Sequence, residues 1–409
     1  MLGRVNRLCP LLLAALLVAG AALGQVAAER VGQVAKLPGE MGAHWVWASD
    51  ALLSRSALFD ADSGQMLGAV DGGQGVTPLR PLVSRARGEV YVVETVYSRG
   101  RRGERTDLVT IYDALRLSPV GEVVIPPKRA DNGNGAWLAG LLDGDRFLVV
   151  FNQNPGMSVS VVDLESRSFV GEIVTGGCGL VLPAGKLRFG MLCGDGTALA
   201  VTLDEAGHEA GRARTERFFD ATVDPLTEKG VRGSRLWWFA SFEGYLFGLD
   251  FTDEKPSAQP KWSLFTDAER AERWRIGGIE HLALHESDDL LYSIVHQGGP
   301  GSHKDAGSEI WVYDLEKHAR VRKIAVANLA AASLRPRLGF RAGGAVDWVL
   351  TRVLPNPGAD TVAVTRDAAP LLFTGQRESG AVGVYDARTG EHLRDLEEAG
   401  IVGGLLVVP

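Results

Sequence analysis

Two histidines four residues apart, His281 and His285, have the residue type and the spacing that a metal site could use. On a helix the two rings would share one face and could bind one metal ion. However, residues 281–285 (HLALH) alternate in the manner of a β-strand. A strand also places both rings on one face, but about 13 Å apart, which is too far for a single ion. We therefore expect a polar strand face and no metal site.

Cysteine is scarce, and its placement predicts one disulfide. Of the three cysteines, Cys9 lies in an N-terminal segment that we expect to be removed, which leaves Cys178 and Cys193. A turn signal at residues 183–186 (PAGK) lies between two short apolar stretches, so a β-hairpin would bring the two sulfurs together. Two cysteines at this separation cannot make a zinc site without several nearby histidines, so a structural disulfide is favoured.

A basic cluster lies between two strand signals in residues 97–107 (YSRGRRGERTD) and comprises Arg99, Arg101, Arg102 and Arg105. Two interpretations stay open. The cluster can be a solvated hairpin loop with internal pairs to Glu104 and Asp107, which would stabilise the fold little. Alternatively, it can be a docking loop for an acidic partner.

Other catalytic signatures are missing from the sequence. It has no haem-attachment motif, nucleophile elbow, Walker loop, zinc-protease motif or calcium loop. A calcium-dependent hydrolase could use Asp131, Asn132 and Asn134, but glycine and asparagine in alternation favour a turn. No spacing there supports a metal cage. We expect neither a catalytic residue nor a metal on this chain.

One repeated phrase predicts the elements that position these residues. An apolar strand ends in an aromatic or aliphatic residue before aspartate, followed by a few polar residues and a second strand. The phrase recurs about seven times, at intervals of about 40 to 70 residues. The aspartates of the copies are Asp60, Asp113, Asp163, Asp204, Asp250, Asp314 and Asp386.

Such strand–turn–strand units cannot bury both faces alone, and closing them into a ring removes exposed sheet edges. We predict an all-β, seven-bladed β-propeller in which residues 403–409 pair with the N-terminal strands. One helix is expected at residues 266–274, with Thr266 as its N-cap and Glu269 completing a capping box.

The N-terminus reads as a cleaved signal peptide, residues 1–28. Arg4 and Arg7 precede an apolar run at residues 11–23, and small residues precede the expected cleavage after Ala28. The run is short for a membrane span, although an uncleaved anchor is the alternative. We expect residues 29–409 to be one soluble, exported domain without membrane insertion. The net charge of −7 argues against nucleic-acid binding.

Several stretches together resemble the heavy subunit of methylamine dehydrogenase and its aromatic-amine relatives. The arginine-rich phrase is the most specific; the Tyr-Asp repeats alone would fit any propeller. The likeness covers nearly the whole chain after the signal, in the same order, through residues 70–73 (VDGG), 97–113, 193–196 (CGDG) with the cysteine pair, 226–250, 269–278 and 301–305.

The resemblance implies a periplasmic propeller, two copies of which would pair with two small, disulfide-rich light chains. In that family the light chain carries the catalytic base and the tryptophan tryptophylquinone. The complex oxidises a primary amine to aldehyde and ammonia, then reduces a small blue copper protein. This chain would then be a scaffold without a cofactor of its own. The alternative is a stand-alone secreted propeller that binds a partner through its arginine loop.

One departure from the family concerns the substrate channel. Methylamine-oxidising members carry a channel-lining phenylalanine just after the Asp-Gly-Gly turn, whereas Gln74 follows that turn here. A polar, flexible side chain in the channel wall predicts a substrate other than methylamine. The alternative is that the loop shifts and Val76 fills the same place.

Overall fold

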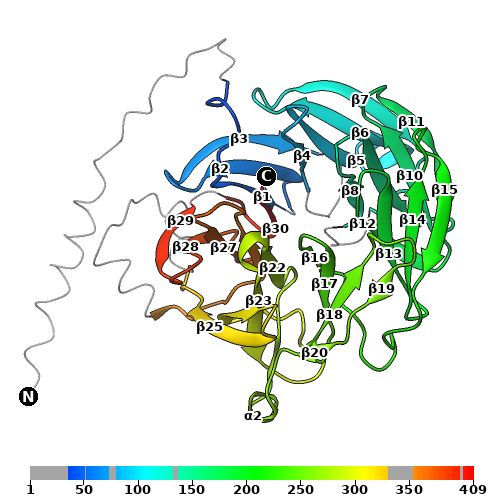
Figure 1. Cartoon of the computed structure of the whole chain (residues 1–409). Coiled ribbons are helices and arrows are strands. Elements are labelled where there is room, and N and C mark those ends of the chain that lie inside the picture. The colour runs from blue at the N-terminus through cyan, green and yellow to red at the C-terminus, as the bar shows by residue number, and fades with distance from the viewer. Residues whose placement is uncertain (1–35, 51, 73–79, 132–136, 330–352, 397–398) are drawn as a thin grey trace, which may run out of the picture. The chain divides into compact units, whose positions relative to one another are not determined.

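The computed structural model describes residues 36–50, 52–72, 80–131, 137–329, 353–396 and 399–409. Residues Leu37–Pro409 form a ring of seven antiparallel sheets (Figure 1). The prediction of an all-β, seven-bladed propeller is therefore confirmed. The signal peptide lies outside the described residues. No helix among the described residues is long and apolar enough to cross a membrane.

Each blade runs from an innermost strand at the ring centre to an outermost strand at the rim. Blade 1 is made of β30 (Gly403–Val407), β1 (Trp45–Asp50), β2 (Arg55–Asp60) and β3 (Gln65–Asp71). Blade 2 is made of β4 (Leu82–Ser84), β5 (Glu89–Arg99), β6 (Arg102–Asp113) and β7 (Pro119–Ile125). Blade 3 is made of β8 (Ala139–Leu141), β9 (Phe147–Asn152), β10 (Ser158–Asp163) and β11 (Ser168–Val174).

Blade 4 continues the pattern with β12 (Cys178–Pro183), β13 (Arg188–Cys193), β14 (Ala198–Leu203) and β15 (Glu209–Arg214). Blade 5 has a divided outer edge and contains β16 (Val231–Arg232), β17 (Leu236–Ala240), β18 (Tyr245–Asp250), β19 (Ser257–Ala258) and β20 (Trp262–Ser263). Blade 6 has a divided inner edge and contains β21 (Trp274–Ile276), β22 (Leu282–His285), β23 (Leu290–Gln297), β24 (Glu309–Asp314) and β25 (Ala319–Ala325). Blade 7 is made of β26 (Thr361–Val364), β27 (Leu371–Gly375), β28 (Val382–Asp386) and β29 (His392–Leu396).

The two ends of the ring meet in blade 1, as predicted. The last strand, β30, pairs antiparallel with β1, with Trp47 opposite Val407 and Ala48 opposite Leu406. This pairing gives β1 a partner on its inner side, so the first blade has no open inner edge.

The repeated aspartate has the same place in every blade, at or just after the end of the third strand. Its carboxylate accepts backbone N–H groups of the following turn. For example, Asp386 Oδ1 accepts from Arg388 at 2.8 Å and Thr389 at 2.7 Å. The least regular copy, Asp204, does the same with Ala206 at 2.9 Å. The repeat is therefore turn chemistry that fixes the hairpin to the outermost strand.

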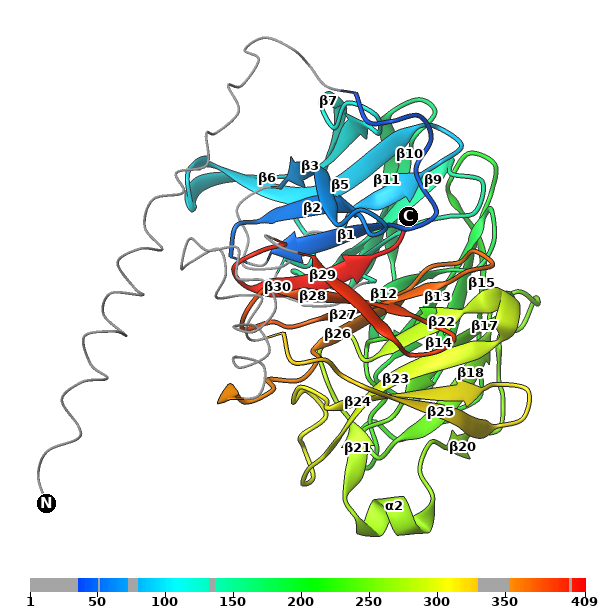
Figure 2. The ribbon, with the colours of Figure 1, turned by 90° about the vertical axis from the view of Figure 1, so that its left-hand side faces the viewer.

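The predicted helix is present but shorter than expected. Helix α2 (Asp267–Ala271) begins with the predicted capping box, in which Thr266 N–H donates to Glu269 at 2.9 Å and Glu269 N–H donates to Thr266 at 3.3 Å. The helix stops early because Arg273 has a φ of 66° and Trp274 already begins β21. It lies at the rim (Figures 1 and 2). A short 3₁₀ turn, η1 (Glu286–Asp288), follows β22.

Candidate functional site: the hairpin face and the central tunnel

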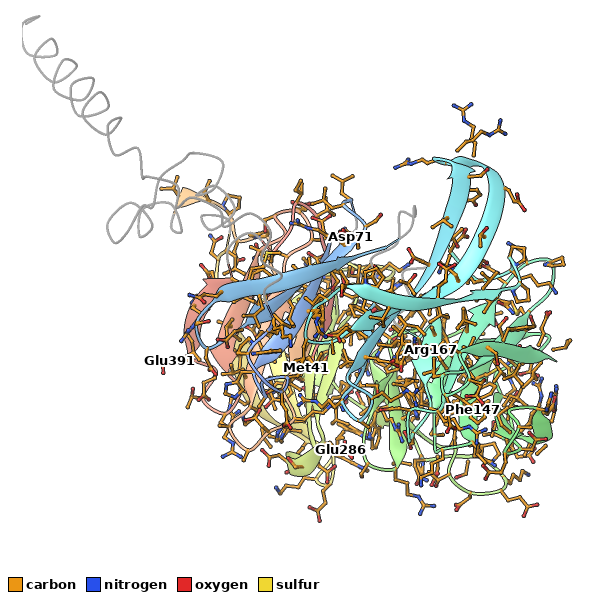
Figure 3. All side chains as sticks on the ribbon, turned by 90° about the horizontal axis from the view of Figure 1, so that it is seen from above. Met41, Asp71, Phe147, Arg167, Glu286 and Glu391 are labelled. Carbon is orange, nitrogen blue, oxygen red and sulfur yellow. A yellow bond between two sulfur atoms is a disulfide. The ribbon has the colours of Figure 1, made fainter. Side chains whose placement is uncertain are left out.

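One face of the ring gathers the segments that the sequence singled out. Adjacent strands of a blade are antiparallel, so the connection between its second and third strands and the connection to the next blade leave the ring on the same side. We call this side the hairpin face. Figure 3 shows Asp71, at the end of β3, on the same side as the projecting β5–β6 hairpin, with Glu286 on the opposite side.

The β5–β6 hairpin is the most prominent feature of the hairpin face. Its strands have 11 and 12 residues, longer than any other described strands, and it projects beyond the other blades (Figure 2). Arg99 pairs with Arg102 across the Gly100-Arg101 turn, and all three arginines of this tip are exposed. We call Arg99, Arg101 and Arg102 the tip arginines.

Arg105 is separate from the tip arginines and belongs to the base of the hairpin. It donates through Nε and Nη2 to the fully buried carboxylate of Asp107, at 2.9 Å each, and its Nη1 lies 3.3 Å from Asp131. These hydrogen bonds to Asp107 raise the pKa of Arg105. Thr95 and the backbone N–H of Arg129 also donate to Asp107, at 2.7 and 2.9 Å. The internal ion pair between Arg105 and Asp107 that the sequence suggested is therefore present, and it stiffens the base of the β5–β6 hairpin.

The turn that precedes Gln74 is anchored to the same hairpin. Gln74 itself lies outside the described residues, as do Val76, Asn132 and Asn134. The Tyr112 hydroxyl, on β6, donates to the Asp71 carbonyl at 2.9 Å, and the Gly72 N–H donates to the Ser54 carbonyl at 2.8 Å. Blades 1 and 2 thus jointly fix the start of the segment that carries Gln74.

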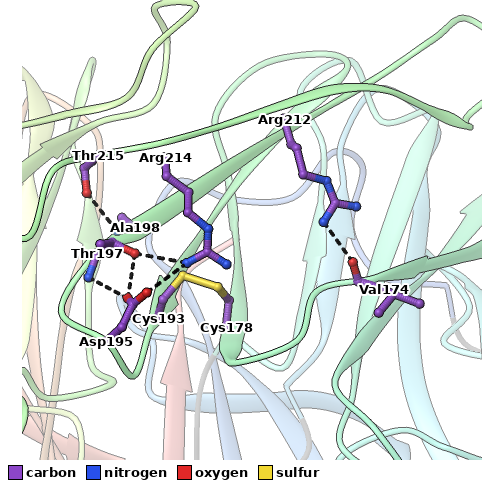
Figure 4. Close-up of a disulfide and its surroundings, with 9 residues drawn as sticks. All are labelled: Val174, Cys178, Cys193, Asp195, Thr197, Ala198, Arg212, Arg214 and Thr215. Carbon is purple, nitrogen blue, oxygen red and sulfur yellow. Dashed lines mark hydrogen bonds and ion pairs between the residues drawn. A yellow bond between two sulfur atoms is a disulfide. The ribbon is translucent and has the colours of Figure 1, made fainter.

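The predicted disulfide forms at the hairpin-face end of blade 4 (Figure 4). Cys178 begins β12 and Cys193 ends β13, and the two are directly opposite in the register, with both side chains buried. The turn at residues 183–186 joins the two strands, as the sequence indicated. Beside the disulfide, Asp195 accepts from Thr197 and pairs with Arg214, which closes the turn after β13.

The two histidines do lie on or beside a strand, since β22 ends at His285 and His281 directly precedes it. Both rings are buried rather than on a solvent-facing surface. His281 Nε2 is 3.0 Å from the Thr227 hydroxyl, and His285 Nε2 is 3.0 Å from the Asp367 carbonyl. Across the described part of the chain, no group of three or more His, Cys, Asp or Glu side chains is arranged to hold a metal ion.

A cavity of about 410 Å³ lies in the centre of the ring, between the innermost strands β16, β22, β26 and β30. Arg80 enters it from the start of blade 2 and stacks on Trp137, with 3.7 Å from the guanidinium carbon to the ring centroid. Trp137 is held by a 2.7 Å hydrogen bond from its Nε1 to the Gly230 carbonyl. Sequence reasoning missed these residues because they come from different blades and share no motif.

A buried carboxyl group, Glu280, also lines this cavity. Its side chain lies 3.6 Å from the ammonium group of Lys229, which in turn lies 3.1 Å from Glu228. Burial raises the pKa of Glu280 to about 7, although Lys229 and Arg80 oppose the shift. In the sequence, the one feature that Glu280 and Arg80 share is their position, because each lies just before an innermost strand.

Several tryptophans of the ring pack against other aromatic rings. In the closest pair, Trp137 and Trp237 meet edge to face with ring centroids 4.6 Å apart. Trp237 is buried and donates its Nε1–H to the Pro183 carbonyl at 3.0 Å. A quinone made from two tryptophans must be open to the amine that it oxidises. This pair does not fit that requirement because one member is enclosed in the wall of the ring.

Solved structures with similar folds confirm the architecture alone. An uncharacterised protein from Desulfotomaculum acetoxidans superposes with a TM-score of 0.55 at 12% identity, over 89% of this chain and 98% of that one. The dihydro-heme d1 dehydrogenase NirN superposes with a TM-score of 0.53 at 15% identity, over 91% of this chain and 77% of that one.

Sequence comparison is more specific. The methylamine dehydrogenase heavy chain of Paracoccus versutus is 29% identical over 86% of this chain and 75% of its own length. That of Methylorubrum extorquens is 25% identical over 86% of this chain and 78% of its own length. The family model described as methylamine dehydrogenase heavy chain (MADH) matches residues 48–332. This chain belongs to the methylamine dehydrogenase heavy chain family.

Proposed function

We propose that this chain is the heavy, scaffold subunit of a periplasmic, quinone-dependent amine dehydrogenase. The observation that carries the proposal is the family match over residues 48–332. In this assignment the chain contributes binding surface and channel wall, and the redox chemistry belongs to a second chain. Because Trp237 is buried in the wall of the ring, the closest tryptophan pair, Trp137 and Trp237, supports a quinone on the partner rather than on this chain.

The partner is a small, disulfide-rich light chain, in an assembly of two heavy and two light chains. That chain carries tryptophan tryptophylquinone, which takes two electrons from a primary amine and passes them to a small blue copper protein. The hairpin face is the surface that we assign to partner contact. The β5–β6 hairpin with its exposed tip arginines supports this choice, because its stiff base holds these charges away from the ring.

Gln74 lines the entrance of the substrate channel in this proposal. Because Asp71 and Gly72 are fixed by Tyr112 and Ser54, the segment that carries Gln74 starts from a defined point on the hairpin face. A glutamine there offers a hydrogen-bonding wall in place of an aromatic one. The substrate is therefore a primary amine other than methylamine.

We assign the chain to the periplasm, after cleavage of residues 1–28. The buried Cys178–Cys193 disulfide supports an oxidising compartment, since thiols in the cytosol are kept reduced.

Reconstitution tests the proposal. The heavy chain is co-expressed with the light-chain gene of the same organism, and amine-dependent dye reduction is measured across primary amines for each chain alone and for the complex. We expect activity only with both chains, and a Gln74→Phe variant should shift kcat/KM toward methylamine. Full activity from the heavy chain alone would contradict the scaffold role.

A further inference from the structure

Exposed apolar side chains are distributed unevenly between the two faces of the ring. Among the described residues, the large apolar side chains that are exposed in connections between strands lie on the hairpin face, with the exception of Leu115. Those on the hairpin face are Leu52, Leu53, Met157, Val223, Val353 and Ile401. Single exposed apolar residues are normal, but a bias toward one face indicates a surface that a partner covers.

Three of these side chains lie on neighbouring connections at the hairpin-face end of blade 1. Leu52 and Leu53 lie in the turn between β1 and β2, and Ile401 lies in the connection from β29 to β30. Their exposed fractions are 61%, 43% and 45%. We call Leu52, Leu53 and Ile401 the apolar platform.

One buried carboxylate holds both connections of the platform. Asp50 ends β1 and is fully buried. Its Oδ1 accepts the backbone N–H groups of Leu52 and Leu53 at 2.7 and 2.8 Å, and its Oδ2 accepts the N–H of Ile401 at 2.5 Å. Hydrogen bonds to a charged group are stronger than those between neutral groups, so the backbone of the platform is fixed in the free chain. A surface that is already ordered loses less conformational entropy when a partner binds.

The platform adjoins the start of the segment that carries Gln74. Gly72 directly follows β3 and precedes Gln74 by two residues. Its N–H donates to the carbonyl of Ser54, which ends the β1–β2 turn, at 2.8 Å. A chain seated on Leu52 and Leu53 therefore lies beside the point where the Gln74 segment leaves blade 1.

We propose that the apolar platform is the contact that holds the light chain on the heavy chain, and that the light chain covers it with an apolar patch of its own. This inference rests on the proposed function, which supplies the partner. The position of the platform selects that partner over a second heavy chain. The wall of the substrate channel has to meet the chain whose quinone oxidises the amine, and the platform adjoins the segment assigned to that wall.

The platform and the tip arginines then have different tasks on the same face. Exposed charges speed the encounter of two chains, and their effect falls as salt rises. Apolar contacts that become buried slow the separation of the chains instead. The two contributions can therefore be measured apart, as a dissociation rate and as a salt-dependent association rate.

Surface plasmon resonance with the full heavy chain and the purified light chain of the same organism tests the platform. The double variant Leu52→Ala/Leu53→Ala should raise the Kd at least tenfold, mostly through faster dissociation, because it removes apolar contact. It keeps both backbone N–H groups that Asp50 accepts, so the turn should stay in place. The change in dissociation rate should not depend on salt, because no charge is removed. Ile401→Ala is a second, independent variant with the same expected direction.

Leu115→Ala is the matched control. Leu115 is also an exposed leucine, at 37%, and its backbone N–H donates to an aspartate, Asp113, at 2.9 Å. It lies between β6 and β7, on the opposite face, so its replacement should leave both rates unchanged. A thermal melt of each variant, followed by circular dichroism, checks that the ring is folded.

The possible failures are distinguishable. If wild type binds the light chain and the platform variants dissociate at the wild-type rate, the platform inference is wrong and the proposed function is unaffected. An equal effect of Leu115→Ala would also overturn the platform inference, because that turn lies on the opposite face. If the wild-type heavy chain does not bind the light chain at all, the proposed function fails, and the platform inference fails with it.

Discussion

Asp107 should be the main stabilising residue at the base of the projecting hairpin. Its carboxylate is fully buried and accepts four hydrogen bonds, from the Thr95 hydroxyl, two nitrogens of Arg105 and the backbone N–H of Arg129. Asp107→Ala removes the anion and leaves the half-buried Arg105 guanidinium with the more exposed carboxylate of Asp131 and the Arg129 carbonyl as its described partners. Breaking a buried ion pair costs about 3–5 kcal/mol, and the remaining Asp131 contact favours the lower end.

This cost converts to a measurable shift in Tm. A ring of about 370 residues has an unfolding entropy of about 0.8 kcal/mol/K, so a loss of about 3 kcal/mol lowers Tm by about 4 °C. Differential scanning calorimetry measures this shift. Limited trypsin digestion provides a local readout, because a loosened base should speed cleavage at the tip arginines.

Asp113→Ala is the matched control, since Asp113 lies on the same strand and also pairs with an arginine, Arg116. This pair is partly exposed, so its loss, together with the turn hydrogen bonds, should cost about 1 kcal/mol. Equal Tm values for Asp107→Ala and Asp113→Ala, with equal trypsin cleavage at the tip, would refute the reasoning from burial.

Three further predictions concern pH, the disulfide and the tip. Burial alone would lower the pKa of His44, but its hydrogen bonds to Asp62 and Asp367 outweigh burial and raise it. The unfolding free energy of wild type minus that of His44→Gln should thus be largest below pH 6.5 and fall as pH rises through the raised pKa; a constant difference from pH 5 to pH 9 would contradict this. Replacing both cysteines by alanine should cost about 3 kcal/mol, seen as a lower midpoint in urea, because the disulfide closes a 15-residue separation; an unchanged midpoint would show that it adds no stability. Replacing the tip arginines by glutamate should slow light-chain association at least tenfold at low salt in surface plasmon resonance, and less at high salt; rates that do not depend on salt would argue against a charge-steered contact.

The parts of the structure that could be predicted are those that depend on residues close together in the sequence. The aspartate of each repeat bonds to backbone N–H groups within a few residues, as Asp386 does, so its pattern is visible without the fold. The same holds for the capping box of Thr266 and Glu269, and for Cys178 and Cys193, which one hairpin brings together.

The parts that sequence reasoning missed depend on the closed ring. Arg80 and Arg366 are brought to one tunnel by blades at opposite ends of the chain, and no local pattern marks their convergence. In the sequence the four arginines also formed a single cluster, with nothing to separate Arg105 from the other three. In the structure Arg105 lies two residues before Asp107 on β6 and pairs with it at the base of the hairpin, whereas the other three arginines remain at the tip.

The central claim is that this propeller works with a small quinone-bearing chain, and isolation of the native complex tests it most directly. The chain is captured from a periplasmic extract of its source, and the co-purifying chains are identified by mass spectrometry and examined by visible spectroscopy. We predict a small, cysteine-rich chain whose quinone absorption bleaches when a primary amine is added. A lone, colourless propeller would contradict the heavy-subunit role and would favour a stand-alone binding protein that uses the tip arginines.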